Sequence, residues 1–233
     1  MKLINEHINI IKFITTILLY FFGSYIQYIP ILLFNIDIKT CSSTTLYALQ
    51  IFYYLFLIIS LSLLYRKDLK KDFKNFIKKF EENTDIAIKY WLIGLIIMGV
   101  SNFLISQFSP VKIANNEQMV RDTINKIPVM AFFFTTLFAP YIEEITFRKA
   151  FRKVINDKTT YILVSGIIFG SMHVLMSVKT VYDYLYIIPY SALGLSFSYI
   201  YAKTENVFPS MFVHAVHNGT ITILTILRAM IIL

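Results

Sequence analysis

The chain has 233 residues, of which 57% are hydrophobic and 15% are charged, and its formal net charge is +8. A mean hydropathy of +0.63 excludes an ordinary soluble domain, and the single cysteine, Cys41, excludes an internal disulfide and a cysteine-based metal cluster. Several separate apolar runs of roughly 20 residues are each long enough to cross a bilayer as a helix. We therefore expect an all-α, polytopic transmembrane helical bundle that forms a single membrane domain over residues 1–233.

The apolar runs predict about seven spans, or eight helices if an interfacial helix is counted. Run length and breaks at proline or charge place the spans at residues 8–34, 44–65, 88–108, 128–150, 158–178, 181–202 and 206–231. The first run is too long for the core of a signal peptide and has no small-residue cleavage site close behind it, so we expect it to be a span. It contains Pro30, which predicts a tilt, a kink or a partly interfacial course.

The segment between the second and third spans, residues 66–83, reads RKDLKKDFKNFIKKFEEN. It places apolar side chains at helical spacing with lysines between them, at Leu69, Phe73, Phe76, Ile77 and Phe80. This pattern predicts a helix that lies on the anionic inner leaflet, and a solvated basic helix in a loop is an equally good interpretation.

The positive charges are unevenly divided between alternate loops. With a cytoplasmic N-terminus, 16 of the 22 Lys and Arg residues lie on the inner side. Because cytoplasmic loops carry the excess of positive charge, we expect a multi-pass protein of the bacterial plasma membrane with its N-terminus in the cytoplasm. No nucleic-acid motif accompanies these charges, so the expected partners are the lipid bilayer and not a nucleic acid.

Ionisable side chains gather in the last four spans, although each costs roughly 2.5 to 3.5 kcal/mol to insert and therefore normally marks function. The ionisable groups are Glu143, Glu144, Arg148, His173, His214 and His217, and the polar Asn218 lies next to the last of them in the sequence. Glu144 and Arg148 are four residues apart and can pair on one helix face, whereas Glu143 points to a different side. His214 and Asn218 are also four residues apart and share a face.

A carboxylate and several histidines in a low-dielectric bundle could bind a metal, shuttle protons or activate water. If Thr159 lies near the inner surface, helical rise places His173 about 20 Å from that surface along its helix. His214 lies only about 12 Å from the same surface along its own helix. Their meeting therefore requires a tilt, or a fifth span that begins in the cytoplasm. Gly170 and Ser171, just before His173, allow another helix backbone to approach closely.

Three short motifs resemble those of the CPBP intramembrane proteases, also called the CAAX protease and bacteriocin-processing (Abi) family. EEITFR at residues 143–148 is similar to EExxxR, FGSMH at 169–173 to FxxxH, and HAVHN at 214–218 to HxxxN. The motifs occur in the family's order, each on a predicted membrane helix. The resemblance covers roughly residues 130–220.

The resemblance implies an intramembrane endopeptidase that cuts a peptide or membrane-associated protein near the cytoplasmic face. Glu143 would be the general base that activates water together with His173, and His214 and Asn218 would stabilise the oxyanion. Glu144 and Arg148 would support this set. Peptide pheromones, bacteriocin precursors or leader peptides are the expected substrates.

The sequence leaves the cofactor and a second function class open. Zinc could be held by Glu143, His173 and His214, although no HExxH motif occurs; His217 stands at an unmatched motif position and is expected to be structural. A non-enzymatic scaffold or bacteriocin self-immunity protein is the alternative function. A proton-coupled transporter is less favoured, because the chain shows no two-halves symmetry.

Overall fold

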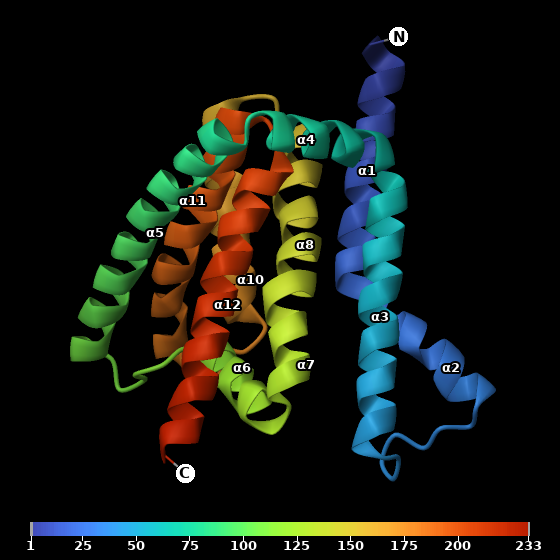
Figure 1. The fold of residues 1–233 in the computed structure, drawn as a ribbon, viewed down its shortest axis with the longest axis vertical. Helices are drawn as coiled ribbons and strands as arrows, with labels where there is room; N and C mark the ends of the chain where they lie inside the picture. Colours follow the sequence, from blue (N-terminus) through green and yellow to red (C-terminus); the bar gives the residue numbers. More distant parts are fainter. Residues whose placement is uncertain (1, 233) are drawn as a thin grey trace.

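The computed structural model describes residues 2–232, so the two terminal residues of the predicted domain, 1 and 233, lie outside it. The described chain is an all-α bundle with seven helices or helical runs that are long and apolar enough to cross a membrane (Figure 1). The predicted multi-pass helical architecture is therefore confirmed. The elements are α1 Lys2–Phe22, η1 Gly23–Gln27, α2 Tyr28–Leu33, α3 Ser43–Leu64, α4 Arg66–Lys78, α5 Phe80–Phe108, α6 Asn115–Lys126, α7 Pro128–Phe133, η2 Phe134–Phe138, α8 Ala139–Glu143, η3 Glu144–Ala150, α9 Phe151–Val154, α10 Lys158–Leu175, η4 Val181–Tyr186, α11 Ile187–Thr204 and α12 Val207–Ile232.

The first span is broken, as its proline predicts. α1 gives way to the 3-10 turn η1, and α2 then leaves the axis of α1 (Figure 1). Pro30 lies in α2. In a regular α-helix its ring would clash with the carbonyl group of the residue four positions earlier, Ile26. The break thus falls in the turn before the proline.

The basic segment forms α4, which lies across one end of the bundle (Figure 1). It is shorter than the predicted helix, because its last residues belong to α5, which begins at Phe80 and not at residue 88. Glu81 and Glu82 occupy the first turn of α5, where carboxylates are favoured by the helix dipole. Leu69 and Phe76 of α4 are buried.

A buried ion pair attaches α4 to the fourth span. Lys149 of η3 pairs with Asp72 of α4, and both side chains are almost fully buried. The Asp72 carboxylate also accepts from the backbone N–H of Val207 at the start of α12. This connection could not be predicted from the sequence, because Lys149 and Asp72 are 77 residues apart and their spacing gives no sign of a pair.

The fourth span is not a regular α-helix. Two π-helical segments, η2 and η3, interrupt it, and η3 contains both Glu144 and Arg148. π-helical turns are rare and often occur at functional sites, because they rotate the following side chains and leave carbonyl groups free for other partners. The element carrying most of the ionisable groups is therefore also the most irregular one.

Small residues bring α10 and α11 into close contact. A Cβ atom added at Gly170 would lie 2.4 Å from the backbone nitrogen of Ser191, and one added at Gly166 would lie 2.7 Å from Cα of Leu195. Only glycine fits at such distances. The predicted close approach before His173 is therefore present, and it fixes the depth of that histidine against α11.

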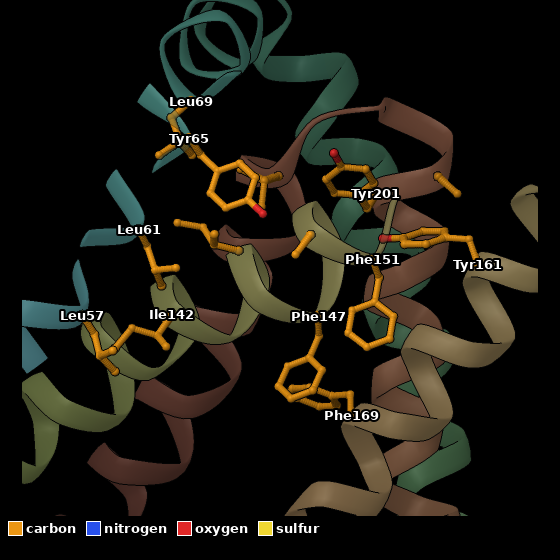
Figure 2. Packing of buried hydrophobic residues seen from close by; sticks show 14 residues of the cluster. Leu57, Leu61, Tyr65, Leu69, Ile142, Phe147, Phe151, Tyr161, Phe169 and Tyr201 are labelled. Atoms are coloured by element: carbon orange, nitrogen blue, oxygen red, sulfur yellow. The ribbon is translucent and has the colours of Figure 1, made fainter. Parts of the chain in front are cut away.

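The largest buried apolar cluster joins α3 to the fourth span and to α10 and α11. Figure 2 shows Leu57, Leu61 and Ile142 on one side of this cluster, and Phe147 beside Phe169 on the other. Phe147 and Phe169 meet edge to face, with ring centroids 5.5 Å apart. This packing holds η3 and α10 side by side next to the ionisable groups.

One helix was not expected from the sequence. α6 is amphipathic and lies at the end of the bundle opposite α4, between the third and fourth spans (Figure 1). Its Ile124 is buried, whereas most of its other side chains are polar. The segment lies between the spans predicted at residues 88–108 and 128–150, and it has too few apolar residues to be a span itself.

Candidate active site

Three of the predicted site residues meet at one atom. The Oε2 atom of Glu143, at the end of α8, lies 3.8 Å from Nε2 of His173 on α10 and 3.6 Å from Nε2 of His214 on α12. The depth difference that helical rise predicts between the two histidines is thus removed by the packing of the helices. Glu143 Oε2 is buried and has no hydrogen-bond partner among the described residues.

The ring of His173 is fixed on three sides. Its Nδ1 lies 2.9 Å from the carbonyl oxygen of Phe169. The Phe169 ring lies against one side, and the Tyr190 ring stacks on the imidazole with centroids 5.1 Å apart and planes 24° apart. Because a carbonyl oxygen can only accept, we assign the His173 proton to Nδ1, which leaves a lone pair on Nε2.

The ring of His214 is also fixed through its Nδ1 atom, in this case by a carboxylate. Its Nδ1 lies 3.0 Å from Oε1 of Glu144, and its ring stacks on Phe197 with centroids 4.8 Å apart. Because Glu144 is paired with Arg148, its carboxylate is ionised and can only accept a hydrogen bond. We therefore assign the His214 proton to Nδ1. Nε2 of His214 therefore also presents a lone pair toward Glu143.

This arrangement directs three acceptor atoms at one small space. Two imidazole Nε2 atoms and the Glu143 carboxylate have no donor between them, which is an unfavourable arrangement in a buried site unless a donor or a cation is shared. A water molecule can satisfy it, because it donates two protons and keeps its oxygen for reaction. The site is therefore suited to hold and activate water.

The Glu144–Arg148 pair supports the site from behind. Both side chains are completely buried, and Arg148 Nε lies 3.2 Å from Glu144 Oε2. The guanidinium also donates to the hydroxyl of Ser165 at 3.2 Å and lies over the Phe169 ring at 4.5 Å. A fully desolvated ion pair is stable only when such additional partners are present.

Sequence reasoning missed the serines that complete this pair. Ser165 of α10 donates to the carbonyl of Phe147 and shares a hydrogen bond of 2.9 Å with Ser198 of α11. Serines in a membrane helix are common, so their number and spacing gave no signal. Only the packing of η3 against α10 shows that Ser165 faces the guanidinium.

Asn218 is bonded to the backbone of the fourth span. Its amide nitrogen donates to the carbonyl oxygen of Thr135 in η2, at 2.9 Å. That carbonyl lies in a π-helical turn, where an external donor is a favourable partner. Asn218 thus joins α12 to the fourth span, one helical turn from His214. The second N–H of its amide has no hydrogen-bond partner among the described residues.

His217 stands apart from Glu143. It is buried on α12 with its ring edge toward Trp91 of α5, at a centroid distance of 6.4 Å. No contact in the described chain joins it to Glu143, and its structural role stays a prediction.

The predicted zinc ligands have suitable donor types, a carboxylate and two imidazoles. Glu143 Oε2 lies 3.6 and 3.8 Å from the two Nε2 atoms, and ligand atoms that share one zinc ion at about 2 Å are separated by similar distances. Across residues 2–232, no group of three or more His, Cys, Asp or Glu side chains meets the full geometry of a metal site. Zinc binding by Glu143, His173 and His214 stays a prediction.

Comparison with known proteins adds independent information on the segment that holds this site. The family model "Type II CAAX prenyl endopeptidase Rce1-like" matches residues 125–220, which include η2, η3, α10, α11 and the motif-bearing part of α12. No solved structure matches the chain significantly.

Two curated relatives are similar over about half of the chain. "Putative membrane peptidase YdiL" of Bacillus subtilis (strain 168) is 29% identical over 114 residues, which cover 48% of this chain and 43% of the relative. The "UPF0177 protein YxdF" of Lactococcus lactis subsp. lactis (strain IL1403) is 22% identical over 146 residues, covering 60% of this chain and 78% of the relative. The chain thus spans less than half the length of the first relative. The resemblance indicated by the three motifs is confirmed, and residues 125–220 are the part of this multi-pass membrane protein that matches the Rce1-like, CAAX-protease family.

Proposed function

We propose that this protein is an intramembrane endopeptidase that hydrolyses a peptide bond in a peptide or membrane-associated protein. The observation that carries the proposal is the convergence of two lone-pair-bearing imidazoles on a buried, unpartnered carboxylate oxygen. The similarity of residues 125–220 to a peptidase family supports it. The scaffold alternative gives no reason to maintain such a costly arrangement in the membrane.

The residues have distinct roles in the proposed reaction. Glu143, with His173, takes a proton from water, and the water oxygen adds to the substrate carbonyl carbon. The carbonyl oxygen becomes an oxyanion. Glu143 passes the proton taken from water to Nε2 of His214, 3.6 Å away, and the resulting imidazolium and the second N–H of Asn218 donate to the oxyanion. When the C–N bond breaks, the same proton returns through Glu143 to the leaving amine, and His214 is neutral again. Glu144 stabilises the imidazolium form of His214 through Nδ1.

We further propose that cleavage takes place toward the α4 end of the bundle, on the cytoplasmic side. Along their helices, Glu143 lies about 16 Å before Val154 and His214 about 10 Å after Val207, at 1.5 Å per residue. Both termini adjoin α4 (Figure 1). The excess of Lys and Arg at this end supports a cytoplasmic location for it in a bacterial plasma membrane.

The experiment uses the purified full chain in nanodiscs with a quenched fluorogenic peptide library. We expect cleavage by the unsubstituted protein and a loss of about 10³-fold or more in Glu143→Gln, which keeps the side-chain size but cannot take a proton. Glu6→Gln, on the exposed first helix, is the matched control and should cleave normally. Absence of cleavage of every peptide would favour the scaffold instead.

Metal dependence is decided in the same assay. Our proposal expects cleavage to continue after chelation and dialysis. Loss of cleavage that is restored by zinc would instead assign Glu143, His173 and His214 to a metal.

A further inference from the structure

A pocket of about 470 Å³ lies at the end of the bundle opposite α4, between α5, α6, α11 and α12. The proposed chemistry does not use it. Its wall is mainly apolar, with contributions from Met98, Ile113, Pro189, Tyr190, Ile221 and Leu224. A pocket of this size can hold several apolar side chains of a ligand.

The pocket begins beside the candidate active site. Tyr190 belongs to its wall and also stacks on the His173 imidazole. Ile221, another wall residue, lies one helical turn beyond Asn218 on α12. One aromatic ring thus separates the pocket from a proposed water-activating residue.

The pocket also carries surplus positive charge. Its lining includes Lys112, Arg121 and Arg228, with Glu117 as the one acidic residue. Glu117 and Arg121 are paired at 2.9 Å. Lys112 donates to a backbone carbonyl, and Arg228 has no ion-pair partner in the part of the chain that the structure describes. An apolar ligand with a carboxylate at its far end would complement this lining.

We propose that this pocket binds the apolar segment of the substrate on the far side of the scissile bond, with an acidic side chain of that segment near Arg228 and Lys112. This inference rests on the proposed function and deepens it by naming the substrate class. Such a substrate would extend from the water-activating site toward the end of the bundle opposite α4. A substrate peptide accounts for the shared Tyr190 wall, which a lipid remote from the chemistry would not require.

The test measures binding separately from cleavage. Glu143→Gln protein in phosphatidylcholine nanodiscs is titrated with fluorescein-labelled, C-terminally amidated peptides that contain Leu-Leu-Leu followed by Asp or by Asn. We expect the Asp peptide to bind up to about fivefold more tightly, as for a partly exposed charge pair. Arg228→Gln should remove this preference, whereas Lys126→Gln, at the same end but outside the pocket, should retain it.

A matched pair of substitutions on α12 tests the apolar wall. Leu224 lines the pocket and Leu227 does not. The side chain of Leu224 is 60% exposed and that of Leu227 is 49% exposed, so replacement of either should not disturb the fold. Leu224→Trp should weaken binding of both peptides about tenfold by filling the space. Leu227→Trp should bind within twofold of the parent, and thermal unfolding checks that both variants are folded.

Equal effects of Leu224→Trp and Leu227→Trp, or equal affinity for the Asp and Asn peptides, would overturn the proposal. It would also be overturned if native mass spectrometry showed an anionic phospholipid that Leu224→Trp expels while peptide affinity stays unchanged. Failure of the proposed function looks different. In that case the peptides bind with the expected preferences, but protein with Glu143 intact does not cut them.

Discussion

The first three helices and the last three helices of the bundle are built on different principles. In the first two spans, 11% and 17% of the most apolar window is buried within the protein, whereas the value for the span at Val181–Thr204 is 67%. α11 carries serine, alanine and glycine on its packed faces, and α1 to α3 present leucine, isoleucine and aromatic side chains outward. The two regions therefore have different surroundings, lipid for one and protein for the other.

This difference teaches what holds a site together inside a membrane. Apolar side chains gain little by leaving lipid for protein, so helices associate tightly only through small residues and shared polar groups. α10, α11 and η3 have both, at Gly170 and at the Glu144–Arg148–Ser165 group. α1 and α3 meet the rest mainly through large apolar side chains, aliphatic as well as aromatic, such as Leu57, Leu61 and Phe13. The family match, residues 125–220, falls on the tightly bonded region.

The largest expected effect comes from breaking the buried ion pair of the tightly packed region. Arg148→Leu leaves the Glu144 carboxylate buried without its cation, so we expect a loss of about 3 to 5 kcal/mol in the free energy of unfolding. Unfolding by SDS titration in mixed micelles measures it. The control is Lys158→Leu, which removes a 58%-exposed partner of Glu205 and should cost less than about 1 kcal/mol. Equal losses in the two variants would contradict the comparison.

A glycine substitution tests the close packing of the same region. Gly170→Ala places a Cβ atom 2.3 Å from Ser191 Oγ, so the helices must separate, and we expect a cost of about 1 to 3 kcal/mol. Nothing lies within 4 Å of the corresponding position at Gly99. Gly99→Ala should therefore be neutral or stabilise α5 by up to about 1 kcal/mol. The same unfolding titration compares the two, and a neutral Gly170→Ala would refute tight packing.

A single hydrogen bond tests the attachment of the first helix. Tyr65 and Thr16 share a buried hydrogen bond of 2.9 Å between their hydroxyl groups. Tyr65→Phe should cost about 1 kcal/mol, because Thr16 loses its partner from another helix. Tyr25→Phe, at a side chain that is 61% exposed, should be within about 0.5 kcal/mol of the parent. A loss as large as that of Arg148→Leu would show that the two regions are bonded alike.

The smallest effect concerns the carboxylate that connects the two regions. Asp68 of α4 binds Lys153 of α9 at 2.8 Å and Lys12 of α1 at 3.5 Å. Burial alone would raise the pKa of Asp68, but the hydrogen bond from Lys153 and the nearby lysine charges outweigh it and hold the pKa below its ordinary value of 3.8. A lowered folded-state pKa stabilises the protein above pH 3.8, and this contribution is lost as the pH falls through the lowered value.

The measurement is the difference in unfolding free energy between the parent and Asp68→Asn from pH 2 to pH 6. We expect a difference that is constant above about pH 5 and shrinks toward zero on acidification. A difference that grows as the pH falls would reverse the assigned sign.

Much of the candidate site could be predicted from the sequence, because intramembrane ionisable residues are rare and each one needs a reason. Glu143, His173 and His214 were identified in this way, and the structure brings their side chains together. Asn218 was expected to stabilise the oxyanion, which stays a prediction; the structure adds that one N–H of its amide donates to Thr135. That partner exists because η2 is π-helical, and apolar periodicity does not distinguish a π-helical turn from an α-helical one.

The sequence by itself determined the number of spans, the break near Pro30 and the ionisable residues that had to face inward, since the length of an apolar run and the cost of a buried charge are local properties. The tertiary structure alone decided that His173 and His214 reach the same oxygen and that Ser165 completes the Arg148 pair. It also placed α4 against Lys149 and left a pocket beside Tyr190. These features depend on helix tilt and on the approach of one backbone to another, which arise from contacts between segments far apart in the chain.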